Sequence, residues 1–106
     1  MARFEVSPAD NRKSFVLTVG DELIVALPEN PTTGYRWELD SPGAPLRLER
    51  DEFAAGGAPG AAGTRRLTFR AAAEGRAHLT LKLRREWEKT QPPIEEFSVT
   101  ADVRSR

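Results

Sequence analysis

Asn30–Trp37, with the sequence NPTTGYRW, joins two segments whose patterns are typical of β-strands. The segment before it, Leu23–Leu27, is apolar throughout, which favours a strand that is covered on both sides for part of its length. The segment after it, Tyr35–Leu39, begins inside the stretch itself and carries an aromatic residue at alternate positions. The stretch is therefore expected to form the connection between two strands of a sheet protein.

The residues of this connection predict a stiff loop. Pro31 fixes its own φ, and Gly34 can adopt a positive φ that allows the chain to change direction sharply. Between them stand two small hydroxyl residues, Thr32 and Thr33, which leave little bulk at the tip. An ordinary turn would explain Asn-Pro followed by Gly equally well. A stiff loop would in addition lose little entropy on binding.

Alternation of apolar and polar residues with a period of two dominates the rest of the chain, as in strands with one buried face. It is clearest at Ala77–Leu83, where His78, Thr80 and Lys82 would face solvent. A short helical turn is plausible only at Ala71–Gly75. The expected strands are Phe4–Val6, Ser14–Val19, Glu22–Leu27, Tyr35–Leu39, Leu46–Phe53 with a break near Asp51, Thr64–Ala71, Ala77–Leu83 and Phe97–Val103.

About seven or eight short strands without an amphipathic helix predict an all-β fold, an antiparallel immunoglobulin-like β-sandwich. A small closed barrel is the competing architecture. The 106 residues are expected to form a single domain, residues 1–106. The chain has no cysteine, so the disulfide of antibody domains is absent and sheet pairing and the core must stabilise the fold.

The composition gives no reason to expect nucleic acid or a membrane as a partner. Lys+Arg and Asp+Glu both number 16, so no excess charge favours nucleic acid or an anionic membrane. No apolar run approaches the length of a membrane span. The N-terminus lacks the apolar segment of a signal peptide, so the sequence as given predicts a cytoplasmic protein. If a leader was removed, we expect a periplasmic or secreted protein instead. We expect a monomer.

Catalytic chemistry is not supported by the sequence. His78 is the single histidine and lies at a polar strand position, where a solvated side chain is expected. Without cysteine or a second histidine, neither a nucleophile dyad nor a histidine-rich metal site can form. The segment Ala54–Gly63, rich in Gly and Ala, precedes a strand and lacks the lysine of phosphate-binding loops. We expect no enzyme, no metal and no cofactor.

A binding surface is better supported. Alternate loops of a sandwich gather at one end, so Pro28–Gly34, Ala54–Gly63 and Arg84–Pro93 would form a three-part edge. The third of these loops contains Trp87, and Trp and Arg are enriched at the residues that dominate binding energy in interfaces.

The complete stretch Asn30–Trp37 resembles the first signature loop of the chagasin family of cysteine-peptidase inhibitors, in which Asn-Pro-Thr-Thr-Gly precedes an aromatic residue and then Trp. Two further motifs of that family occur here in altered form. Ala62 stands in the glycine-rich loop where glycine is expected, and Glu86 replaces the proline of Arg-Pro-Trp. The residues implied in binding a peptidase are Asn30, Pro31, Thr32, Thr33, Gly34, Tyr35, Gly60, Ala61, Ala62, Gly63, Arg85, Glu86 and Trp87.

The resemblance implies a reversible, tight-binding inhibitor of papain-like cysteine peptidases whose three loops occupy the active-site cleft. Thr32 and Thr33 would lie against the active-site cysteine, and the glycine-rich loop would pair along the non-primed side by backbone hydrogen bonds. Arg85 and Trp87 would occupy the primed side.

Three alternatives remain open from the residues. Trp87 could be a lid on the end of the sandwich, whereas Trp37, on a strand, is expected to anchor the core. The protein could be a non-inhibitory immunoglobulin-like binding module that uses the same edge. A metabolic enzyme is the remaining class.

Overall fold

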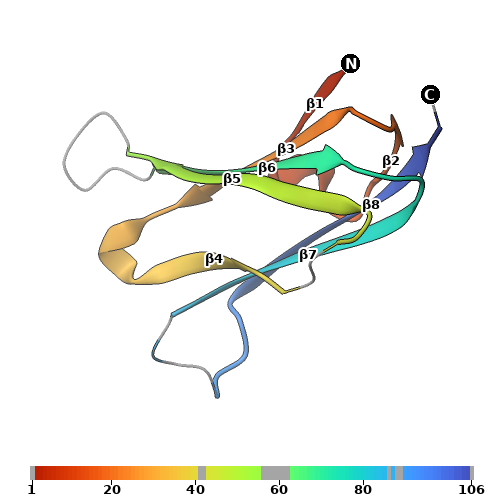
Figure 1. Cartoon of the computed structure of the whole chain (residues 1–106). Coiled ribbons are helices and arrows are strands. Elements are labelled where there is room, and N and C mark those ends of the chain that lie inside the picture. The colour runs from red at the N-terminus through yellow and green to blue at the C-terminus, as the bar shows by residue number, and fades with distance from the viewer. Residues whose placement is uncertain (1, 41–42, 56–62, 86, 88–89, 106) are drawn as a thin grey trace.

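Eight strands form two four-stranded sheets in the computed structural model, which describes residues 2–40, 43–55, 63–85, 87 and 90–105. One sheet has the strand order β1-β3-β6-β5 and the other β2-β8-β7-β4, and the sheets face each other as two layers (Figure 1). The strands are β1 (Arg3–Val6), β2 (Ser14–Thr18), β3 (Glu22–Glu29), β4 (Tyr35–Leu39), β5 (Leu46–Ala54), β6 (Gly63–Ala71), β7 (Gly75–Arg85) and β8 (Glu95–Arg104).

This arrangement confirms the predicted immunoglobulin-like sandwich rather than a closed barrel. Within it, two pairings run parallel, which the alternation of residues did not predict. β1 pairs with β3 in parallel, and β2 pairs with β8 in parallel; the other strand pairs are antiparallel. Alternation identifies which face of a strand is buried, but it carries no information about the direction of the neighbouring strand.

The core consists of the inward-facing apolar residues of both sheets, as the alternation predicted. Ala77, Leu79 and Leu81 of β7 are almost completely buried, whereas His78 between them is exposed. Trp37 is 7 % exposed and belongs to this core, which confirms its predicted role as an anchor. Ile24 on β3 is also buried, so this strand is covered on both faces for part of its length, as expected.

Two local predictions were wrong. No helical turn forms at Ala71–Gly75: β6 continues to Ala71, and Gly75 has φ +141°. Short 3-10 turns occur instead at Pro8–Asp10 and Pro31–Thr33, where proline fixes the φ of the first residue. β5 has no break near Asp51; its pairing with β6 shifts register between Leu48 and Arg50.

The register of the strands brings three connections to one end of the sandwich. Glu29 at the end of β3 pairs with Gly63 at the start of β6, and Ala54 at the end of β5 pairs with Thr64. Tyr35 at the start of β4 pairs with Arg85 at the end of β7. Both chain termini lie toward the other end (Figure 1). Among the described residues, no helix is long and apolar enough to span a membrane.

Candidate functional site

The three connections at this end are named here by their sequence: the Thr loop (Asn30–Gly34, between β3 and β4), the Gly/Ala loop (residues 55–62, between β5 and β6) and the Trp loop (residues 86–94, between β7 and β8). The structure confirms that they emerge from the same end. Four residues of the predicted site, Gly60, Ala61, Ala62 and Glu86, lie outside the described residues. Gly63 is the first residue of β6, and the third loop begins after Arg85 rather than at Arg84.

Asn30 organises the Thr loop by accepting hydrogen bonds at two oxygens. Its side-chain Oδ1 accepts from the backbone N–H of Thr32 at 3.1 Å and from the Thr32 hydroxyl at 2.7 Å. Its backbone carbonyl accepts from the N–H of Thr33 at 3.2 Å and from the Thr33 hydroxyl at 2.8 Å. These bonds hold residues Pro31–Thr33 in a 3-10 turn and leave both threonines exposed at the tip. The expected stiffness of the loop thus has a physical basis.

Arg85 connects the Thr loop to the Trp loop. From the last position of β7, its Nε donates a hydrogen bond to the carbonyl oxygen of Thr33 at 3.0 Å. Its guanidinium lies 4.5 Å from the centre of the Tyr35 ring and 5.8 Å from that of the Trp87 ring. Such cation–π contacts are favourable at partly exposed sites. Arg85 therefore supports the Thr loop in addition to any contact that it makes with a partner.

Trp87 lies against the Thr loop with most of its surface free. It is 70 % exposed, and a Cβ atom added at Gly34 would run into its ring. Gly34 also has φ +81°, a conformation that favours glycine. Glycine is thus needed here for two reasons, its backbone conformation and the approach of the indole. The exposure of Trp87 fits a contact residue better than a buried lid over the sandwich end.

Glu29 is a part of this site that the sequence reasoning missed. It immediately precedes the Thr loop and is 4 % exposed, which is unusual for a carboxylate. Its Oε1 accepts a hydrogen bond from the backbone N–H of Trp37 at 2.8 Å, and Trp37 in turn donates from Nε1 to the carbonyl of Pro28 at 2.9 Å. Glu29 therefore joins the end of β3 to β4 in the opposite sheet, at the base of the Thr loop.

Arg65 neutralises the buried carboxylate. Its Nη2 lies 2.7 Å from Glu29 Oε2, and its Nη1 lies 3.1 Å from Asp51 Oδ1. The hydrogen bond to Glu29 raises the pKa of the Arg65 guanidinium above its ordinary value, although desolvation of the charge opposes this shift. Extending the alternation of β3 and β6 past Leu27 and Leu67 would have placed both charged residues on the inward face.

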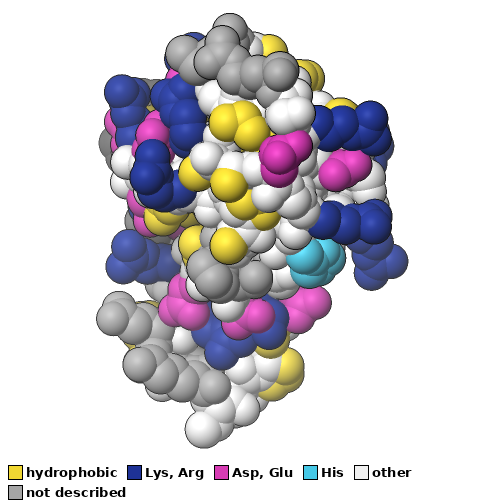
Figure 2. Space-filling model, turned by 45° about the vertical axis from the view of Figure 1, so that its right-hand side comes forward, with side chains coloured by type: hydrophobic (Ala, Val, Ile, Leu, Met, Phe, Trp, Pro, Cys, Tyr) yellow, Lys and Arg dark blue, Asp and Glu magenta, His cyan; other side chains and the backbone are white. Residues whose placement is uncertain are grey.

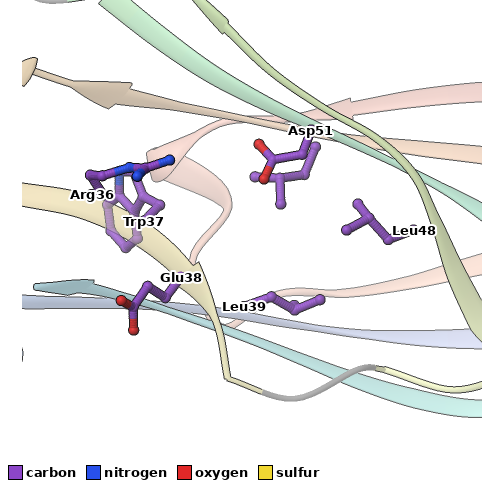
Figure 3. Close-up of a pocket in the computed structure, with 7 residues that line it drawn as sticks. Arg36, Trp37, Glu38, Leu39, Leu48 and Asp51 are labelled. Carbon is purple, nitrogen blue, oxygen red and sulfur yellow. The ribbon is translucent and has the colours of Figure 1, made fainter. Parts of the chain in front are cut away.

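A small cavity opens along the side of the sandwich, between the edge strands β4 and β5, with a volume of about 290 Å³. Figure 3 shows Leu39 of β4 with Leu48 and Asp51 of β5 around this opening. Among the described residues, its lining contains no serine, threonine, lysine or histidine, and Asp51 is paired with Arg65. The cavity therefore holds no pair of nucleophile and base.

Charges of both signs are mixed on one face of the molecule (Figure 2). Figure 2 shows Lys or Arg and Asp or Glu side chains interspersed on one face, with the single histidine exposed among them. His78 Nδ1 lies 3.2 Å from the Thr100 hydroxyl. Within the described part of the chain, no group of three or more His, Cys, Asp or Glu side chains could hold a metal ion.

The sequence matches the family described as "Chagasin family peptidase inhibitor I42" over residues 16–101. Comparison with curated protein sequences finds no significant match.

Several solved structures share the fold. The cysteine protease inhibitor EhICP2 from Entamoeba histolytica has a TM-score of 0.89 and 23% identity, over 98% of this chain and 97% of that chain. Amebosin has a TM-score of 0.77 and 24% identity, over 96% and 98%. PbICP-C, solved in complex with falcipain-2, has a TM-score of 0.58 and 13% identity, over the full length of both chains. At these identities the structural likeness establishes the fold.

Proposed function

The chain belongs to the chagasin family of peptidase inhibitors, and from this premise we propose that it is a reversible inhibitor of papain-like cysteine peptidases. Members of this family are inhibitors, not enzymes. The fold relatives support a cysteine peptidase as the target, since EhICP2 is described as a cysteine protease inhibitor and PbICP-C was solved with falcipain-2. The inhibitor would act as a monomer through the end that carries the three loops.

The observation that carries this proposal is the pre-formed Thr loop. Its tip presents two exposed threonines, and both hydroxyls already bond to Asn30 within the loop. The loop therefore has little conformational freedom left to lose when it enters a narrow cleft. Small side chains at the tip let its backbone approach the peptidase closely. We place Thr32 and Thr33 against the catalytic cysteine.

The other two loops would flank the tip in the cleft. Arg85 and Trp87 stand beside the Thr loop, where they would contact the primed side, and the Arg85 guanidinium lies over the Tyr35 ring. Residues 60–63 would pair with the non-primed side through backbone hydrogen bonds, as an extended peptide does. A wedge of this kind would block the catalytic centre without presenting a peptide bond in the orientation that cleavage requires.

Titration of papain with the purified protein tests this function. We expect competitive, reversible inhibition at or below micromolar concentration, with the inhibitor chain intact on a gel after prolonged incubation. A serine peptidase such as trypsin serves as the control and should retain its activity while the chain remains intact. Full papain activity at micromolar inhibitor would contradict the proposal.

A non-inhibitory binding module is the second candidate. Two departures from the family motifs favour it, Ala62 in the glycine-rich loop and Glu86 in place of proline. In that case the same edge would bind a protein other than a papain-like peptidase, and the papain titration separates the two functions.

A further inference from the structure

Arg65 lies where the inward face of the sandwich changes from apolar to charged. It continues the inward-facing series of β6 beyond Leu67 and Phe69, and only 11 % of its side chain is exposed. Across the strand pairs it stands opposite Leu27 of β3 and Phe53 of β5. It is therefore the last inward-facing side chain of β6 before the Gly/Ala loop, because the next inward position of this strand is Gly63.

The guanidinium of Arg65 bridges two strands. On one side it contacts Glu29, with Nη2 at 2.7 Å from Oε2 and Nε at 3.4 Å from Oε1. On the other side Nη1 donates to Asp51 at 3.1 Å, and the guanidinium carbon lies 5.4 Å from the centre of the Phe53 ring. Glu29 leads directly into the Thr loop, whereas Asp51 and Phe53 lie near the end of β5 that leads into the Gly/Ala loop.

We infer that Arg65 is a positioning residue that fixes the base of the Thr loop relative to strands β5 and β6 before a peptidase binds. This inference rests on the proposed inhibition. The planar fork of arginine suits the role, since it can bond to two carboxylates at once; a lysine ammonium lacks that geometry.

Stability alone is a weak explanation for this cluster. A buried ion pair is often no more stabilising than apolar side chains of the same volume, because both charges lose their hydration. A neutral pair would serve stability as well: an amide side chain at position 29 could still accept from the N–H of Trp37, and an apolar side chain at position 65 would continue the core. The hydrogen bonds of Arg65 instead have a fixed direction, and they connect the end of β3 to β5.

Three variants test the inference. Arg65→Gln removes the bridge, but it leaves the Glu29 carboxylate buried without its partner and could lower stability. Glu29→Gln/Arg65→Gln removes both charges and keeps an amide oxygen that can accept from the N–H of Trp37. Arg70→Gln is the matched control, because Arg70 forms similar ion pairs with Glu22 and Glu49 at the far end of β6.

Two quantities are measured for each variant: the inhibition constant against papain, and the amide hydrogen exchange of Thr33 and Tyr35. We expect the double variant to raise the inhibition constant and to accelerate this exchange by at least about tenfold each, because a pre-set loop geometry is lost. Arg65→Gln should do the same, and Arg70→Gln should change neither.

The outcomes separate the inference from the function on which it rests. Wild-type exchange rates and inhibition in the double variant would overturn the inference, and so would faster exchange with unchanged inhibition. If the wild-type protein does not inhibit papain, the proposed function fails, and the exchange rates still decide whether Arg65 holds the Thr loop.

Discussion

Replacing Trp87 by alanine is expected to weaken the complex with papain by at least about 2 kcal/mol, or about 30-fold in the inhibition constant, and to leave the fold intact. The side chain is 70 % exposed, so its truncation removes little from the core. In the complex, by contrast, the indole would become buried against the peptidase. Large aromatic side chains that are exposed in the free protein and buried on binding often dominate interface energies.

The control for this variant is Val16→Ala. Val16 is 57 % exposed. It lies on β2, at the edge of the sheet opposite to β4, and β4 and β7 are the strands that lead into the Thr loop and the Trp loop. Both variants should keep the wild-type urea midpoint, and only Trp87→Ala should change inhibition. An inhibition constant for Trp87→Ala within about twofold of wild type would remove Trp87 from the contact surface.

Replacing Gly63 by alanine is expected to lower the free energy of unfolding by about 3 kcal/mol. A Cβ atom at this position would run into the carbonyl oxygen of Ala54 and the ring of Phe53. The carbonyl belongs to the backbone of β5, so it can move away only if the pairing of β5 with β6 opens near Ala54. Glycine is required at position 63 because the strands approach each other closely there. At Gly34, by contrast, a positive φ also requires glycine.

Urea unfolding measures this effect, with Thr68→Ala as the control. Thr68 lies on the same strand, and its truncation only removes atoms. We expect the midpoint of Gly63→Ala to fall with an unchanged slope, and the control to stay close to wild type. A loss below about 1 kcal/mol in Gly63→Ala would mean that the hairpin relaxes around the added methyl group.

The strands and their buried faces were predictable because alternation with a period of two is a direct consequence of strand geometry. Ala77–Leu83 shows this most clearly, since each expected inward residue is buried. The Thr loop was also predictable, because proline and glycine constrain the backbone at its two ends. The parallel pairing of β1 with β3 was not predictable, because the choice and direction of a neighbouring strand depend on contacts between distant segments.

The charged cluster behind the loops was missed for a different reason. Glu29 and Arg65 occupy inward positions, whereas charged residues are usually exposed in folded proteins. Only the pairing of β3 with β6 brings them within reach of each other, and sequence spacing does not reveal it. Arg85 was predicted as a contact residue, and its hydrogen bond to Thr33 adds a supporting role that depends on the pairing of β4 with β7.

The Thr loop is proposed to block the cleft of a papain-like peptidase. The most direct test is to titrate papain with the double variant Thr32→Glu/Thr33→Lys. This tip variant keeps the net charge and adds bulk at the tip of the loop. The control variant, Ala72→Glu/Ala73→Lys, adds the same side chains at the turn after β6, at the other end of the sandwich. We expect the tip variant to lose inhibition by at least about 100-fold, because larger side chains hold the loop backbone away from the catalytic centre. The control variant should inhibit like wild type. Equal inhibition by both variants and the wild type would contradict the claim.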